Sequence, residues 1–189
     1  MILLINNNLI ETSIGLFPDV GATYFLPRIC NNDPKIGLYL GLTGDKIKGK
    51  DLAICGVATH YVPKQNLENL RKDIINNVNE ETNLEKLKEI VKSYAEVTYS
   101  EDNFSFPNID EIHRIFAVDT MQDLHKRLLN LFENGSDTEK LWAKNVMGVL
   151  SRASQISQAV VLEQIKRGLL FTSIEEAYNL EAQLVARYL

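Results

Sequence analysis

Residues 14–24 read Ile-Gly-Leu-Phe-Pro-Asp-Val-Gly-Ala-Thr-Tyr, and this stretch is the most informative part of the chain. Pro18 pre-sets a turn, and Asp19 is placed to cap a helix that begins there. Gly21 would let a backbone segment or a ligand approach closely. Glu11 lies eight positions before Asp19, so two carboxylates flank an apolar turn. Such a pair suits acid–base chemistry in a partly dry pocket, because burial and mutual repulsion push carboxyl pKa values apart.

The composition is that of an ordinary globular protein. The chain has 189 residues, 45% of them hydrophobic and 24% charged, which is enough for one domain or slightly more. A net charge of −5 argues against a general nucleic-acid binder. No apolar run is long enough for a membrane span, and residues 1–10 read poorly as a transit peptide. We expect a soluble protein of a reducing compartment, with reduced thiols at Cys30 and Cys55 and neither nucleic acid nor membrane as a partner.

The hydrophobic periodicity predicts a helix-rich α/β chain. Short strands are expected at residues 1–5 and 57–62. Helices are expected in the first third of the chain at residues 19–28, 35–42 and 50–55. From residue 66 onward, apolar residues recur at every third or fourth position, which favours a series of amphipathic helices broken by a loop at residues 99–107. We therefore divide the chain into a small α/β piece over residues 1–63 and a helical module over residues 64–189.

Several segments between residues 11 and 63 carry a resemblance to a known family. They are Glu11-Thr-Ser-Ile-Gly-Leu-Phe-Pro-Asp-Val-Gly21, Tyr24-Phe-Leu-Pro-Arg28, Leu40-Gly-Leu-Thr-Gly44, Gly49-Lys-Asp51 and Cys55-Gly-Val-Ala-Thr-His-Tyr-Val-Pro63. This ordered series resembles the 3-hydroxyisobutyryl-CoA hydrolase branch of the crotonase (enoyl-CoA hydratase/isomerase) superfamily, in its C-terminal half only. Residues 64–189 are similar to the later region of that family in the order of their helices.

The resemblance implies both a fold and a reaction. The fold would be the last part of a crotonase-like strand-strand-helix spiral, followed by a C-terminal helical module. The reaction would be hydrolysis of a 3-hydroxyacyl-CoA thioester to the free acid and CoA in valine catabolism, with no cofactor beyond the CoA of the substrate. Glu11 would be the catalytic nucleophile or general base, and Asp19 would orient the 3-hydroxyl group and the attacking water. Glu11, Asp19 and Gly21 would contact the substrate, and the compartment would be mitochondrial by resemblance and otherwise cytoplasmic.

The sequence also departs from the family pattern. Ile10 precedes Glu11 where the family has proline, and the glycine run is shortened to Gly21-Ala-Thr23. The family region that supplies the oxyanion-hole backbone has no counterpart in residues 1–10. Removing one oxyanion donor costs about 100- to 1,000-fold in rate, so we expect impaired hydrolysis by this chain alone.

Other functions remain open at this point. The chain could be a catalytically inactive fragment or paralogue that binds a full-length relative or a second copy through its helices. A weaker alternative is an enoyl-CoA hydratase or isomerase, against which the acid at Asp19 argues. Residues 44–50 mimic a phosphate loop, but Asp51 stands where Ser or Thr is needed, and the three histidines lack metal-ligand spacing. No metal is therefore expected, and Arg28 is assigned to a helix C-terminus.

Overall fold

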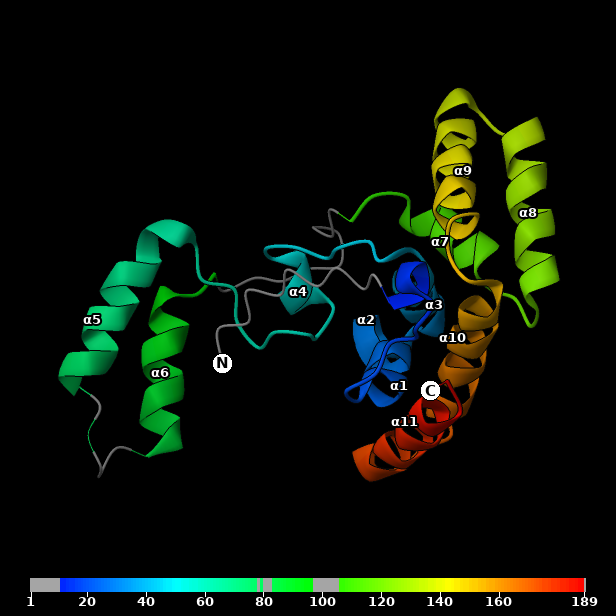
Figure 1. Ribbon diagram of the computed structural model, residues 1–189. Helices are drawn as coiled ribbons and strands as arrows, with labels where there is room; N and C mark the ends of the chain where they lie inside the picture. Colours follow the sequence, from blue (N-terminus) through cyan, green and yellow to red (C-terminus); the bar gives the residue numbers. More distant parts are fainter. Residues whose placement is uncertain (1–10, 78, 80–82, 97–105, 189) are drawn as a thin grey trace. The chain divides into compact units, whose positions relative to one another are not determined.

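A computed structural model describes residues 11–77, 79, 83–96 and 106–188. The described residues form two compact units, one within residues 47–96 and one containing residues 11–46 and 106–188 (Figure 1). The division that the sequence predicts between residues 63 and 64 stays a prediction, because the two units are divided at other positions. In chain order, with η for a 3-10 helix, the elements are η1 Glu11–Ile14, α1 Ala22–Phe25, η2 Leu26–Arg28, α2 Ile29–Asn32, α3 Pro34–Thr43, α4 Asp51–Ile54, η3 Lys64–Asn66, α5 Leu67–Asn77, α6 Leu84–Tyr94, α7 Ile109–Ile115, α8 Met121–Asn134, α9 Asp137–Leu150, α10 Gln155–Gly168 and α11 Ile174–Tyr188.

The helix-rich prediction is confirmed, whereas the predicted strand at residues 57–62 is wrong. This segment is irregular, and the described part of the chain contains no β-strand. A strand needs a hydrogen-bonded neighbour, and apolar, β-branched residues do not form one by themselves. The other predicted strand, at residues 1–5, and most of the predicted loop at 99–107 lie outside the described residues. The α/β character and the strand-strand-helix spiral therefore stay predictions.

The helix predicted at residues 19–28 is shorter and is capped differently. Val20 and Gly21 have φ angles of 56° and 90°, which excludes them from a right-handed helix. The N-cap position of α1 is occupied by Gly21, which has no side chain to cap the helix. The prediction that Asp19 caps this helix is therefore wrong. Pro27 lacks a backbone N–H, and the chain continues after Phe25 as the 3-10 helix η2.

Helix α3 forms the centre of the larger unit. Asp33 caps it by accepting a hydrogen bond from Lys35 N at 3.0 Å, and Pro34 occupies its first turn. Every residue from Ile36 to Leu42 is buried. The helix contacts η1, η2, α7, α9 and α10, so nearly all of its surface is covered by other elements of this unit. These contacts hold η1, the element that begins with Glu11, against the core of the unit.

The smaller unit contains α4, α5 and α6. Helices α5 and α6 contact each other, with Leu70 buried and the Tyr94 hydroxyl donating to Asp73 Oδ2 at 3.0 Å. None of the predicted site residues lies in this unit.

Two further expectations from the sequence concern the cysteines and membrane-spanning helices. Cys30 and Cys55 are both disulfide-bonded, so the expectation of two reduced thiols is wrong. Among the residues that the structure describes, no helix has the length and apolarity that a membrane span requires.

Candidate active site

Glu11 opens helix η1 and is half-buried. Its Oε2 atom is buried, and no donor of the described residues bonds to it. Burial raises the pKa of the Glu11 carboxyl above its usual value, a backbone hydrogen bond opposes this effect, and the charge of Asp19 raises the pKa further. A carboxyl group with an uncommitted oxygen and a raised pKa can serve as a base or nucleophile near neutral pH.

Asp19 lies on the turn between the buried Phe17 and helix α1, and its side chain is exposed. The charge of Asp19 contributes to the raised pKa of the Glu11 carboxyl, so the two groups interact electrostatically. A shared catalytic role for the two carboxylates stays a prediction. The turn around Asp19 is strained, because the next residue, Val20, is β-branched and has a positive φ angle. Val20 is also 81% exposed, so its own packing does not compensate for this backbone conformation.

Gly21 is tightly packed against side chains of a helix of the same unit, and not against the backbone segment or ligand that the sequence predicted. A Cβ atom at this position would lie 3.3 Å from Ile174 Cδ1 and 3.4 Å from Tyr178 Cε1, both on α11. The Gly21 N–H also donates to the carboxylate of Glu181 on the same helix. A contact between Gly21 and the substrate stays a prediction.

Two buried side chains hold the turn that carries Asp19. Glu181 of α11 is 4% exposed, and its two carboxylate oxygens accept hydrogen bonds from Gly21 N at 2.8 Å and Thr23 N at 2.9 Å. Gln164 of α10 is 3% exposed, and its amide nitrogen donates to Pro18 O at 2.9 Å and to Thr23 Oγ1 at 2.8 Å. The turn is therefore bonded at both ends to helices about 140 to 160 positions later in the chain.

Arg28 bonds the end of α1 and η2 to the C-terminus of α10 and to the segment that follows it. Its guanidinium donates to Tyr24 O at 2.7 Å, to Gly168 O at 2.8 Å and to Phe171 O at 2.5 Å. Because Gly168 is the last residue of α10, the prediction that Arg28 serves a helix C-terminus is confirmed. The backbone of Gly168 lies so close to Thr23 O that a Cβ atom at this glycine would overlap the oxygen.

The sequence analysis missed Glu181 and Gln164, although a signal was present. Glu181 falls within the apolar stripe of the last helix, four positions after Ala177 and three before Leu184. Gln164 likewise follows Val161 by three positions. A polar residue in the stripe that faces the core is expected to be buried and hydrogen-bonded. This pattern identifies such residues, but it does not identify the backbone groups to which they bond.

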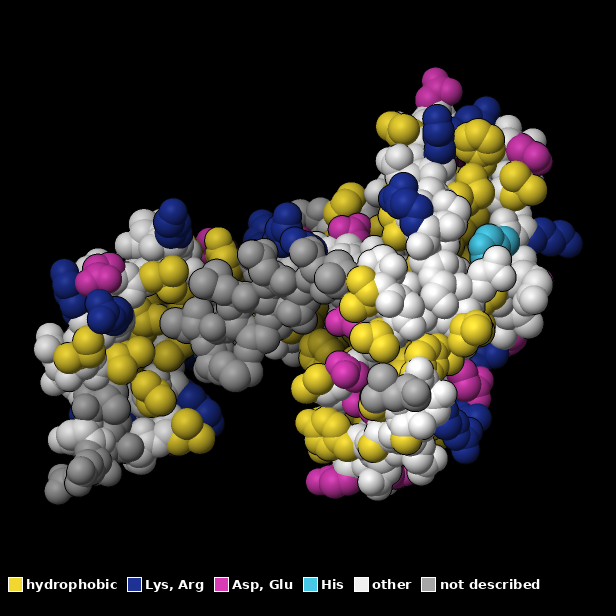
Figure 2. Space-filling view, viewed as in Figure 1, with side chains coloured by type: hydrophobic (Ala, Val, Ile, Leu, Met, Phe, Trp, Pro, Cys, Tyr) yellow, Lys and Arg dark blue, Asp and Glu magenta, His cyan; other side chains and the backbone are white. Residues whose placement is uncertain are grey.

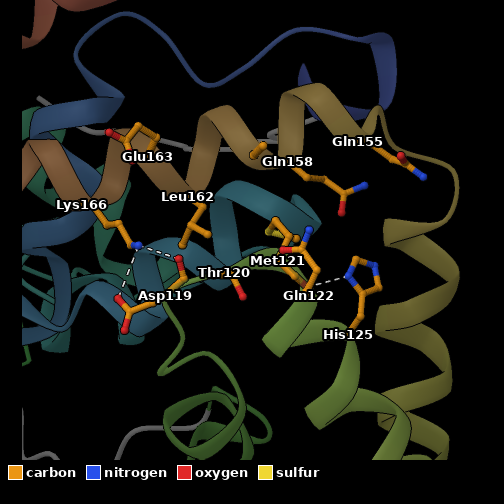
Figure 3. A pocket seen from close by; sticks show the side chains of 11 residues that line it. Asp119, Thr120, Met121, Gln122, His125, Gln155, Gln158, Leu162, Glu163 and Lys166 are labelled. Atoms are coloured by element: carbon orange, nitrogen blue, oxygen red, sulfur yellow. Dashed lines mark hydrogen bonds and ion pairs between the residues drawn. The ribbon is translucent and has the colours of Figure 1, made fainter.

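A cavity of about 460 Å³ lies elsewhere in the larger unit, between the N-terminal part of α8 and helix α10 (Figure 3). In it, Lys166 Nζ donates to Asp119 O at 2.6 Å, and His125 Nδ1 is 2.7 Å from Met121 O. None of the predicted site residues lines this cavity. In the described residues, no group of three or more His, Cys, Asp or Glu side chains is arranged to hold a metal ion.

Comparisons with known proteins identify the family of the chain. A family model described as "Enoyl-CoA hydratase/isomerase" matches residues 8–189. A protein of Dictyostelium discoideum named "3-hydroxyisobutyryl-CoA hydrolase, mitochondrial" is 35% identical over 179 residues, which cover 95% of this chain and 44% of that relative. A protein of Homo sapiens with the same name is 31% identical over 177 residues, which cover 92% of this chain and 42% of that relative. The chain thus spans less than half the length of these curated relatives.

A solved structure shows the same fold. The crystal structure of a carnitinyl-CoA dehydratase from Mycobacterium thermoresistibile matches with a TM-score of 0.68 at 24% identity, over 90% of this chain and 44% of the other. The family match extends over nearly the whole chain and includes both carboxylates, the turn between them and the helices that hold the turn. The chain therefore belongs to the enoyl-CoA hydratase/isomerase (crotonase) family.

Proposed function

We propose that this chain hydrolyses, or contributes to the hydrolysis of, a 3-hydroxyacyl-CoA thioester, with 3-hydroxyisobutyryl-CoA as the substrate to test first. The observation that carries the proposal is the Glu11 carboxyl, whose Oε2 is buried and uncommitted and whose pKa is raised by burial and by Asp19. The chain is also 31% to 35% identical to proteins named as hydrolases of this substrate. The names of these relatives include the word mitochondrial, which supports a mitochondrial location as part of the same proposal. The place in valine breakdown that the family resemblance implies belongs to the proposal as well.

Glu11 and Asp19 have different roles in this proposed reaction. Ionised Glu11 either takes the proton of a water that attacks the thioester carbonyl carbon, or attacks that carbon itself. In both cases the C–S bond breaks and CoA leaves as the thiolate, which then takes up a proton. In the second case the acyl group is left on Glu11 as a mixed anhydride, and water hydrolyses it to the free acid and restores the carboxylate. Asp19 accepts a hydrogen bond from the 3-hydroxyl group and so orients the acyl chain. The reaction needs no cofactor beyond the CoA of the substrate. The negative charge that develops on the carbonyl oxygen requires hydrogen-bond donors.

Two backbone donors close to Asp19 do not meet that requirement. The N–H groups of Gly21 and Thr23 both donate to Glu181, so they are occupied by a protein acceptor. The oxyanion must be stabilised by other donors. We expect a low rate for the chain alone, because each oxyanion donor that is lacking would cost about 100- to 1,000-fold.

The test is release of free thiol from 3-hydroxyisobutyryl-CoA by purified wild type, Glu11→Gln and Asp19→Asn. Glu68→Gln is the matched control, because this exposed glutamate lies in the other unit. We expect slow turnover that Glu11→Gln abolishes, that Asp19→Asn weakens and that the control leaves unchanged. Turnover that persists in Glu11→Gln would contradict the assigned role. Conversion of an enoyl-CoA without thiol release would favour a hydratase or isomerase.

A second candidate function is binding to a full-length relative or to a second copy of the chain. It is favoured by exposed apolar side chains in the larger unit, with Ile14 63% and Phe25 42% exposed. Figure 2 shows hydrophobic side chains on the visible surface over α1 and α11. Size-exclusion chromatography of the chain, alone and mixed with a full-length relative, tests this function. Co-elution without thiol release by the chain alone would support it, and elution as a monomer in both samples would contradict it.

A further inference from the structure

We propose that Glu181 and Gln164 are positioning residues that hold the Pro18–Thr23 turn and thereby set the place of Asp19 relative to Glu11. The proposal rests on the proposed function for its catalytic meaning. Its structural part, that two buried side chains determine where Asp19 lies, stands on geometry alone and is tested separately below.

Glu181 is buried without a cation beside it. Among the described residues, no Lys, Arg or His side chain forms an ion pair with this carboxylate. Burying a charge is costly unless hydrogen bonds compensate for the lost water. Here the compensation comes from two backbone N–H groups two residues apart, those of Gly21 and Thr23, each within 2.9 Å. A carboxylate that bridges two such donors fixes the direction of the backbone between them.

Gln164 of α10 also bonds to the turn. Its amide nitrogen bonds to the carbonyl oxygen of Pro18 and to the hydroxyl of Thr23, so it joins the residue before Asp19 to the first turn of α1. Its Oε1 atom is buried with no hydrogen-bond partner in the described structure. Gln164 therefore retains a costly unpaired acceptor while its nitrogen serves the turn.

The backbone of the turn is strained at Val20. Val20 has a φ angle of 56°, in a region that a β-branched residue rarely adopts. Strain of this kind persists only where the surroundings over-determine the backbone, and it clusters at functional sites. The side chain at the apex is exposed and contributes little packing. The bonds from Glu181 and Gln164 supply the constraint, and Asp19 is the charged group that they hold in place.

The test follows the titration of the Glu11 carboxyl by NMR in the full chain. Because the charge of Asp19 raises the Glu11 pKa, movement of Asp19 away from Glu11 lowers that pKa. The variants are Glu181→Gln, Asp19→Asn and their combination. We expect Glu181→Gln to lower the Glu11 pKa toward its value in Asp19→Asn and to have no further effect once Asp19 is asparagine. Hydrogen exchange at the Gly21 and Thr23 amides should accelerate in the same variant.

The matched control is Glu176→Gln. Glu176 lies on the same helix and also accepts two backbone N–H bonds, from Thr172 at 2.9 Å and Ser173 at 3.1 Å, but it does not touch the turn. This control should leave the Glu11 titration unchanged. A folded Glu181→Gln variant with the wild-type Glu11 pKa would overturn the proposal. If Glu181→Gln does not fold, Gln164→Ala is subjected to the same titration and decides the question.

Thiol release in the same variants separates this proposal from the proposed function. Misplacement of a positioned group by about 1 Å can cost about 100-fold in rate, so we expect kcat to fall by about 10- to 100-fold with little change in KM. A wild type without thiol release would count against the hydrolase function. The titration and the hydrogen exchange would still confirm or refute the positioning of Asp19.

Discussion

Replacement of Gly168 by alanine tests whether the candidate site depends on the close approach of α10 to α1. The added Cβ would overlap the Thr23 carbonyl oxygen and lie 3.1 Å from Pro27 Cγ. Because the obstructing oxygen belongs to the backbone, no change of side-chain rotamer relieves the contact. The two helices must move apart, and Thr23 is the residue that both Glu181 and Gln164 bind.

The size of the effect follows from two opposing contributions. Overpacking of a tight contact costs about 1–3 kcal/mol. Alanine in place of glycine in a helix returns at most about 1 kcal/mol. We expect a net loss of about 1–2 kcal/mol in the free energy of unfolding, which lowers Tm by about 2–8 °C for a chain of this size.

The measurement is thermal unfolding followed by circular dichroism, with Gly148→Ala as the matched control. Gly148 lies within α9, and a Cβ at this position would meet no atom within 4 Å. Gly148→Ala should therefore leave stability unchanged or raise it by up to about 1 kcal/mol. If Gly168→Ala melts at or above the wild-type temperature, or shifts as Gly148→Ala does, the close contact does not constrain the site.

Three further predictions address charge and capping. Glu11→Gln should stabilise the protein more at pH 7 than at pH 4, measured by urea unfolding, because the folded-state pKa of Glu11 is raised above 4.5 and its ionisation costs stability as pH rises through that pKa. An equal effect at both pH values would contradict this reasoning. Arg28→Lys should lower the free energy of unfolding by about 1–3 kcal/mol in the same assay, since an ammonium group cannot reproduce the fork that reaches three carbonyls. Unchanged stability would show that these bonds contribute little. Glu139→Gln should remove a pH dependence that wild type shows in thermal unfolding. The backbone N–H and hydroxyl of Ser136, followed by Arg114, lower the pKa of Glu139 to about 2. Ionised Glu139 therefore stabilises the fold above pH 4.5, and this stabilisation is lost as the pH falls toward 2. A variant with the same acid profile as wild type would refute this assignment.

The first predicted helix, at residues 19–28, was only partly predictable from local sequence. Pro18, Asp19 and Gly21 correctly indicated a turn followed by a helix, because proline and glycine restrict or extend the backbone wherever they occur. The cap assigned to Asp19 was wrong, since Val20 and Gly21 are left-handed and place Gly21 at the N-cap. Long-range bonds from α10 and α11 stabilise that conformation, and no local pattern contains them.

The sequence by itself determined the helices with long amphipathic stripes, the family resemblance and the pair of carboxylates. Periodicity and turn residues act over a few positions, so one chain suffices to read them. Only the tertiary structure decided that residues 57–62 form no strand, that the Glu11 carboxyl keeps an uncommitted oxygen, and that Glu181 and Gln164 hold the turn beside it. The bonds from Glu181 and Gln164 to the turn join groups about 140 to 160 positions apart, and their proximity follows from how the helices of this unit pack.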